Sequence, residues 1–157
     1  MSIVAFDLGT SFCRISNWWD GDEPKIIYTM PSIVSYKEGN FYFGKKAESL
    51  ATENSSNTIY EIKRVLGMQF GGETEREKRE MNLYQTIWPF SLENSSKGTY
   101  QIVLENEKRI TIEEITTMIL KHLKESAEEI LDCEIENVVI TIPSIFFFFL
   151  TFFISLF

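Results

Sequence analysis

The sequence predicts an α/β fold, and three observations support this prediction. The chain of 157 residues is about one domain long and opens with short apolar segments that have the length of strands. Helical periodicity is clearest over Ile112–Leu131, where apolar residues recur at steps of three and four. An unbroken β-branched run, Val138–Ile142, follows that helix. Because a helix followed by an apolar strand is typical of α/β cores, we expect both kinds of element to share one core.

The N-terminal strands are expected at Ile3–Leu8, Cys13–Trp18 and Lys25–Tyr28. Glycine and proline within residues 20–24 predict a turn between the second and third strands. Strands joined by short turns pair in antiparallel fashion, so these segments predict a β-meander.

Residues 31–107 have a more mixed composition. The pair Gly39-Asn40 lies between the apolar segments Ile33–Tyr36 and Phe41–Phe43 and indicates a β-hairpin. The charged run Glu73–Glu80 contains both signs, which predicts a helix or loop in contact with solvent. We assign no function to that run.

The helix expected over Ile112–Leu131 has a clear beginning and a buried face. Thr111 and Glu114 have the spacing of a capping box, which satisfies free N–H groups at a helix start. His122 has no cysteine, aspartate or second histidine at metal-ligand spacing, so we expect a surface histidine. The strand Val138–Ile142 is expected to be covered on both faces because its β-branched run is unbroken. The residues expected on the buried face of the helix are Ile112, Ile115, Ile119, Leu123, Ala127 and Ile130.

Charge and cysteine content exclude some classes of function. Lysine and arginine total 15 against 23 aspartate and glutamate residues, which gives a formal net charge of −8. Nucleic-acid binding needs clustered basic residues that neutralise phosphates, so we expect no nucleic-acid partner. Cys13 and Cys133 have no metal-ligand spacing, which favours free thiols in a reducing compartment. Asp7 interrupts the first apolar run before it reaches the length of a signal peptide, so we expect a cytoplasmic protein.

The first strand ends in a pattern that suits phosphate binding. Asp7, at the end of an apolar strand, can hold a hydrated Mg²⁺ through its carboxylate. Gly9 lets the backbone approach a phosphate closely, and the N–H groups and hydroxyls around Thr10 and Ser11 can donate to its oxygens. The same residues are also compatible with an ordinary glycine turn after a hydrophobic strand.

Four further segments occur in an order known from one protein family: Thr29–Tyr36, Phe43–Ala47, Asn57–Gly67 and Val138–Ser144. Together with the opening segment they resemble the 70-kilodalton heat-shock chaperone family over residues 2–144. The resemblance implies the first lobe of an ATPase domain with the actin-like, ribonuclease H-like fold.

This resemblance implies how the lobe is divided and what it binds. Residues 1–30 and 108–144 would form a core subdomain, and residues 31–107 a peripheral one. The cofactors would be ATP or ADP with Mg²⁺, and Asp7 would act in catalysis by organising the Mg²⁺ through water. The residues that would contact the nucleotide are Gly9, Thr10, Ser11 and Phe12. Packing in the core is the alternative role of Phe12.

Lys63 is the second catalytic residue that the resemblance implies. An ammonium group can offset the negative charge of a γ-phosphate and orient an attacking water molecule. Periodicity alone favours a different interpretation, in which Lys63 and Arg64 are exposed positions of an amphipathic helix over Ile59–Leu66. Only the resemblance favours the catalytic role.

The function that the resemblance implies is that of an ATP-binding molecular chaperone. ATP hydrolysis would be coupled to the binding and release of unfolded polypeptides, and co-chaperones would be further partners. Another enzyme of the actin-like fold, such as a sugar or acetate kinase, would share the Asp7–Thr10 segment but not the segments around Lys63 and Ile140. A non-catalytic interaction module that uses residues 31–107, with or without a membrane tether, is the other alternative.

The segment 145–157 does not follow the family pattern, since seven of its thirteen residues are phenylalanine and none is charged. The uncharged run 138–157 is long enough for a membrane-spanning helix, but Pro143 interrupts it and no basic residue flanks it. A buried apolar extension of the lobe is a second interpretation. We favour a third, in which the coding frame continues into non-coding DNA, because T-rich triplets encode phenylalanine, leucine, isoleucine and serine.

On this third interpretation, a longer parent protein would carry the second lobe and the peptide-binding domain beyond residue 144. A membrane partner is then not expected. Because ATP is held between two lobes in the family, we expect the chain to be inactive as an ATPase by itself.

Overall fold

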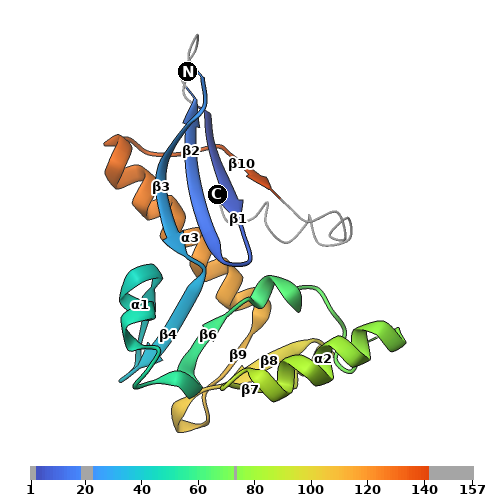
Figure 1. Ribbon diagram of the computed structural model, residues 1–157. Coiled ribbons are helices and arrows are strands. Elements are labelled where there is room, and N and C mark those ends of the chain that lie inside the picture. Colours follow the sequence, from blue (N-terminus) through green and yellow to red (C-terminus); the bar gives the residue numbers. More distant parts are fainter. Residues whose placement is uncertain (1–2, 19–22, 73, 142–157) are drawn as a thin grey trace.

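The computed structural model describes residues 3–18, 23–72 and 74–141 and confirms the α/β class (Figure 1). The turn expected over 20–24 lies mostly outside these residues, and the segment 145–157 lies wholly outside them. The strands are β1 (Ile3–Leu8), β2 (Phe12–Trp18), β3 (Lys25–Pro31), β4 (Ile33–Lys37), β5 (Asn40–Phe43), β6 (Thr58–Tyr60), β7 (Ser91–Asn94), β8 (Tyr100–Val103), β9 (Arg109–Thr111) and β10 (Val138–Thr141). The helices are α1 (Gly44–Leu50), α2 (Glu75–Ile87) and α3 (Ile112–Leu131), with short 3₁₀ turns η1 (Ser55–Asn57), η2 (Ile62–Arg64) and η3 (Glu105–Glu107).

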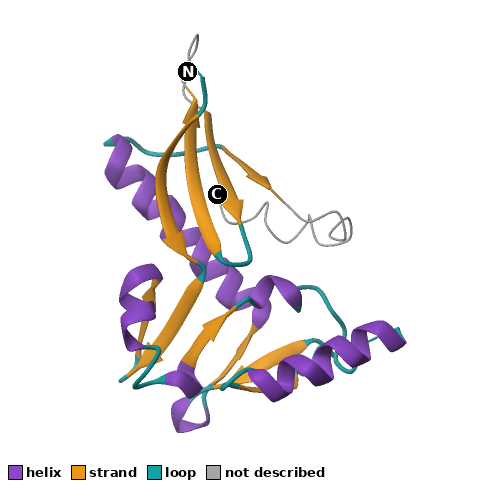
Figure 2. Ribbon diagram, in the orientation of Figure 1, coloured by secondary structure: helices purple, strands orange, loops and turns teal. Residues whose placement is uncertain are grey.

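The described strands form three sheets. One sheet has four strands in the order β10-β1-β2-β3, and the other two have the orders β5-β4-β6 and β7-β8-β9. Figure 2 shows the four-stranded sheet in the upper part of the molecule and the two smaller sheets in the lower part, with α3 extending from one part to the other.

The four-stranded sheet contains the expected meander of three antiparallel strands, and β10 adds to it parallel to β1. Strand β3 is longer than predicted and continues to Pro31. Burial alternates along β1 and β2, as it does in a sheet with one covered face. The covered face faces α3 (Figure 1) and includes Val4, Phe6, Leu8, Cys13 and Ile15.

Helix α3 has the bounds that the sequence predicts. The capping box is confirmed: the Thr111 hydroxyl accepts a bond from the Glu114 N–H, and the Glu114 carboxylate accepts one from the Thr111 N–H. Ile130 is an exception to the predicted buried face, with 46% exposure, because Leu131 packs against the core at that turn instead. The other five expected positions are buried, namely Ile112, Ile115, Ile119, Leu123 and Ala127.

The expectation that the last strand is covered on both faces is wrong. Strand β10 lies at the edge of the described sheet, and its residues alternate between half-buried and exposed. Val139 is 56% exposed. Among the described residues no helix covers the sheet face opposite α3, so the outward side chains of β10 meet solvent.

Strands β4 and β5 form the predicted hairpin, but its turn lies one residue earlier than the Gly39-Asn40 signal. Lys37 pairs with Asn40, and the two turn residues between them, Glu38 and Gly39, both have positive φ. Two such residues are typical of a type I′ turn, whose twist matches that of the flanking strands. Asn40 therefore belongs to the strand and not to the turn.

The helix considered over Ile59–Leu66 is wrong. Residues 58–60 form β6, which pairs with β4 and is joined to it by a bond of 2.9 Å between the Thr58 and Ser35 hydroxyls. The chain then turns at Glu61, where φ is 57°, into the single 3₁₀ turn η2. Strand pairing across the chain overrides the local periodicity here, and the apolar residues still reach the core from a strand and a turn.

Helix α2 contains most of the charged run Glu73–Glu80, of which Glu73 lies outside the described residues. The prediction of a solvent-exposed helix or loop is confirmed for the described part. Thr74 and Glu77 form a second capping box at its start. Only one face is anchored, where Met81 is buried and Tyr84 stacks on Trp88 with ring centroids 4.8 Å apart.

Shortening a core side chain of α3 tests this packing. Ile119→Ala should lower the free energy of unfolding by about 2 to 5 kcal/mol, because it removes a fully buried side chain and leaves a cavity. Ile130→Ala on the same helix is the matched control and should change it by about 0.5 kcal/mol or less. Urea unfolding followed by circular dichroism measures both, and equal losses would contradict the burial pattern of α3.

Candidate functional site

The Asp7 carboxylate lies near the C-terminal end of β1, on the sheet face opposite α3. Strand pairing places it beside Arg14 of β2 and Thr141 of β10. Arg14 Nη1 donates to Asp7 Oδ2 at 3.1 Å, and the Thr141 hydroxyl donates to Asp7 Oδ1 at 2.8 Å. The side chains of Asp7 and Arg14 remain 42% and 40% exposed, so a ligand can reach both.

The turn between β1 and β2 requires glycine at position 9. A Cβ atom on Gly9 would collide with the backbone carbonyl oxygen of Phe12. Because this obstacle is backbone, a change of side-chain rotamer cannot remove it. The turn places the half-buried Thr10 and the exposed Ser11 three and four residues beyond Asp7. Phosphate binding by these residues stays a prediction.

Ser32 connects this turn to the junction of β3 and β4. Its hydroxyl donates to the Gly9 carbonyl at 2.8 Å, and its N–H donates to the Ser11 carbonyl at 2.9 Å. The Cys13 thiol lies 3.1 Å from the same hydroxyl oxygen, and the two groups share a hydrogen bond in which either can donate. Ser32 and Cys13 are buried, so solvent does not compete for these bonds.

The Cys13 thiol reports which charges lie near the turn. Burial raises the pKa of this thiol, and its hydrogen bonds with Ser32 and Gly9 lower it. The negative charge of Asp7 also raises the pKa, and the positive charge of Lys63 lowers it. Strand register agrees with this: Ile33 follows Ser32 and pairs with Tyr60, so the chain enters η2 and Lys63 close to the turn that Ser32 bonds.

Lys63 is half-buried in η2 and is not an exposed position on a helix. Its neighbour Arg64 is held in place, since Arg64 Nε donates to Glu61 Oε2 at 2.8 Å. Within the described part of the chain, no hydrogen bond or ion pair engages the Lys63 ammonium. The ammonium is therefore available to an anionic ligand near the turn.

Phe12 begins β2 and is 46% exposed. The alternative role of core packing is therefore wrong, because the ring lies mostly outside the buried cluster. Its backbone carbonyl defines the space at Gly9, whereas contact between its ring and a nucleotide stays a prediction.

The residues around Asp7 fit Mg²⁺ only together with a ligand. Each Asp7 oxygen already accepts one protein hydrogen bond but keeps further acceptor capacity for water. In residues 3–18, 23–72 and 74–141, no group of three or more histidine, cysteine, aspartate or glutamate residues is placed to hold a metal. Mg²⁺ commonly keeps several waters and is shared between one or two carboxylates and substrate phosphates. Asp7 suits that arrangement.

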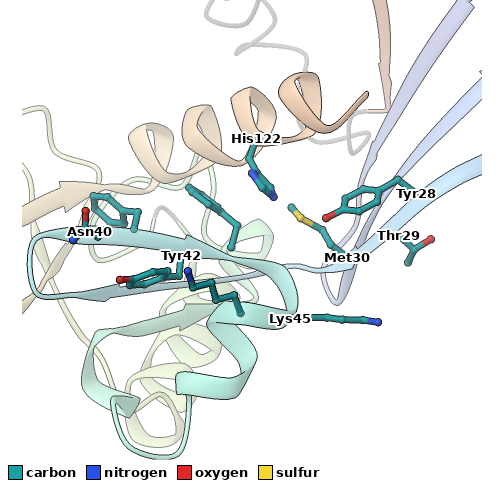
Figure 3. Close-up of a pocket in the computed structure, with 10 residues that line it drawn as sticks. Tyr28, Thr29, Met30, Asn40, Tyr42, Lys45 and His122 are labelled. Carbon is teal, nitrogen blue, oxygen red and sulfur yellow. The ribbon is translucent and has the colours of Figure 1, made fainter. Parts of the chain in front are cut away.

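A cavity of about 750 Å³ lies between β3, β5, α1 and α3 (Figure 3). None of the residues predicted for the phosphate site lines it. His122 reaches it from α3 and stacks on Phe43 with ring centroids 4.8 Å apart, so the expected surface histidine is in fact half-buried. Burial lowers the pKa of His122.

Sequence analysis missed three residues of the site: Arg14, Ser32 and Thr141. Arg14 gave a usable signal, because it is the one charged residue of the expected strand Cys13–Trp18 and follows the turn closely. Ser32 and Thr141 gave none, since their partners are defined by strand register and by the β3–β4 junction.

The mixed α/β architecture of these sheets and helices is typical of a lobe of an actin-like ATPase domain. In a comparison with protein families, the model described as Hsp70 protein matches residues 3–148 of the chain. The chain belongs to the Hsp70 family of chaperones, which confirms the resemblance found in the sequence. Members of this family bind ATP or ADP with Mg²⁺ and act on unfolded polypeptides with co-chaperones.

No helix formed by the described residues combines the length and the apolar character needed to cross a membrane. The segment 145–157, on which the hypothesis of a membrane anchor depends, lies outside those residues.

Replacing Gly9 tests the steric constraint at the turn. Gly9→Ala should destabilise the protein by about 1 to 3 kcal/mol, because the new methyl group meets the Phe12 carbonyl and the backbone must shift. Ser11→Ala, at the exposed neighbouring position, should stay within about 0.5 kcal/mol of the unmodified chain. Thermal unfolding measures both variants, and a neutral Gly9→Ala would contradict the geometry of the turn.

His122 is the one histidine of the sequence, so its titration can be followed without assignment of others. Its pKa, measured from the imidazole proton shifts by NMR, should lie below the ordinary value of 6.5. The unfolded chain then binds the proton more tightly, so stability should fall as the pH is lowered through 6.5. Phe43→Ala should open the imidazole to solvent and raise the pKa toward 6.5. A pKa above 6.5 in the unmodified chain would contradict the burial of the ring.

Proposed function

We propose that residues 3–141 provide one side of a Mg·ATP site in a chaperone ATPase. The observation that carries the proposal is the approach of η2, which contains Lys63, to the Gly9 turn: Ser32 bonds the turn, and the next residue, Ile33, pairs with Tyr60 just before η2. The Asp7 carboxylate can hold the metal ion, the Gly9 turn can admit a phosphate group, and the Lys63 ammonium can offset its charge. Together these groups suit the binding of a phosphate with Mg²⁺.

The proposed roles follow from the chemistry of each group. The N–H groups and hydroxyls around Thr10 and Ser11 donate to phosphate oxygens, and Gly9 allows the close approach. Asp7 holds water molecules of the Mg²⁺ shell, and the bound ion neutralises phosphate charge. Lys63 offsets negative charge on the γ-phosphate and orients the attacking water. Phe12 offers an exposed ring beside the turn for contact with the nucleotide.

We also propose the division into a core subdomain, residues 1–30 and 108–144, and a peripheral subdomain, residues 31–107. The four-stranded sheet with α3 and the two smaller sheets support this division. In the proposed arrangement the core carries Asp7 and the Gly9 turn, and the peripheral part carries Lys63. Relative movement of the two parts would therefore change the distance between the carboxylate and the ammonium.

The described residues enclose a nucleotide from one side only, since the side chains of Asp7 and Phe12 are open to solvent. Affinity is consequently expected to be weak, and the 157-residue chain is expected not to turn over ATP by itself. Coupling of hydrolysis to the binding and release of unfolded polypeptides, with co-chaperones as partners and a cytoplasmic location, belongs to the proposed function of a two-lobed protein.

Equilibrium binding of Mg·ATP to the whole chain tests this proposal. Lys63→Ala and Asp7→Ala should each weaken binding about tenfold or more, because each removes a charged contact worth about 1.5 kcal/mol or more. Isothermal titration calorimetry at millimolar ATP measures the change, and circular dichroism shows whether each variant folds.

Lys121→Ala is the matched control, because Lys121 is an exposed lysine of α3 whose nearest carboxylate, on Glu125, is 3.9 Å away. It should leave ATP affinity unchanged. A chain that folds but binds no Mg·ATP at millimolar concentration would overturn the nucleotide site. The same result would favour a non-catalytic interaction module that uses residues 31–107, for which the exposed Leu83 and Ile87 of α2 are the supporting observation.

A further inference from the structure

Arg14 has a place at the phosphate site that the family assignment does not explain. It lies directly opposite Asp7 in the antiparallel pair of β1 and β2, so both side chains emerge on the same face of the sheet. The bond from Arg14 Nη1 to Asp7 Oδ2 therefore follows from strand register and not from a chance meeting of flexible surface groups. Any rearrangement that separated the pair would have to shift that register.

The ion pair with Asp7 uses only part of the hydrogen-bonding capacity of the Arg14 guanidinium. An arginine has five N–H donors, and within the described residues only Nη1 is engaged, by Asp7. The side chain is 40% exposed, so a ligand at the nearby Gly9 turn can approach it. A planar fork of N–H donors matches the oxygens of a phosphate, and such charge-assisted bonds are among the stronger ones in proteins.

The charges around the turn also favour an anion. Asp7 contributes one negative charge, which Arg14 neutralises, and Lys63 contributes a positive charge with no carboxylate partner among the described residues. The turn therefore carries a local excess of positive charge in a chain whose formal net charge is −8. A phosphate chain can be attracted there without a metal ion.

We propose that Arg14 is a phosphate-binding residue that makes nucleotide binding at this site partly independent of Mg²⁺. Its guanidinium holds Asp7 with one nitrogen and offers its other donors to a phosphate oxygen. It thus supplies part of the positive charge that Mg²⁺ would bring. This inference rests on the proposed nucleotide site and adds a residue to it.

The test compares ATP affinity in excess Mg²⁺ and in excess EDTA, using the whole chain and titration calorimetry. The unmodified chain should bind ATP in both conditions. Arg14→Ala should weaken metal-free binding about tenfold or more, because it removes charge-assisted bonds to phosphate. In Mg²⁺ the loss should be clearly smaller, since Asp7 is then free to hold the hydrated ion. The ratio of the dissociation constants in EDTA and in Mg²⁺ is thus the diagnostic quantity.

Two further variants separate phosphate contact from a structural role. Arg14→Lys keeps the charge but loses the planar fork, and should lie between the unmodified chain and Arg14→Ala in metal-free affinity. Asp7→Asn removes the negative charge that pairs with Arg14 but keeps an oxygen acceptor, so it should strengthen metal-free binding while it weakens Mg·ATP binding. If the ion pair were purely structural, replacing Arg14 or Asp7 would lower ATP affinity by the same factor in Mg²⁺ and in EDTA.

Arg109→Ala is the matched control. Arg109 also forms a half-exposed cross-strand ion pair, with Glu93 at 3.0 Å, and it belongs to the β7-β8-β9 sheet away from the turn. It should leave the ratio unchanged. Binding of Mg·ATP with the same ratio in the unmodified chain and in Arg14→Ala would overturn the role of Arg14 and leave the nucleotide site standing. If the unmodified chain bound ATP neither in Mg²⁺ nor in EDTA, both the role of Arg14 and the proposed nucleotide site would be overturned.

Discussion

The hydrogen bonds of Ser32 define the geometry on which the candidate site depends. One residue separates β3 from β4, and that residue bonds two carbonyl groups of the Gly9 turn through its hydroxyl and its N–H. The four-stranded sheet, the turn and the sheet that leads to Lys63 therefore meet at a single buried serine. These two bonds tie the turn to the junction that leads, through the pairing of β4 with β6, to η2.

Much of the fold could be predicted because its signals are local. The bounds of α3 and the Thr111 capping box follow from periodicity and spacing within one helix, and the β4–β5 hairpin follows from a turn pair. The errors occurred where partners distant in the sequence decide the structure. Residues 59–66 have helical spacing, but pairing of β6 with β4 makes a strand of their first part. An unbroken β-branched run at residues 138–142 predicted a covered strand, whereas the position of β10 at the sheet edge leaves Val139 exposed.

The residues of the candidate site also differ in whether a local pattern or a distant strand partner determines their position. Asp7 and Gly9 could be found from sequence, because a carboxylate and a glycine after an apolar strand form a local pattern. The position of Lys63 near the turn depends on how η2 follows β6, and periodicity alone favoured an exposed helix instead. Arg14 is opposite Asp7 only because of the register of β1 and β2. Local patterns thus identify the groups that do chemistry, whereas register determines which charges oppose them.

The parallel contact between β1 and β10 has a consequence for how the chain is made. Val4 pairs with Val138, so the first strand to leave the ribosome can complete its sheet only after nearly the whole described chain has been synthesised. Until α3 emerges, the apolar face of the first three strands has no cover and is exposed to association with other chains. A protein of a chaperone family would therefore itself pass through the kind of partly folded state that chaperones recognise.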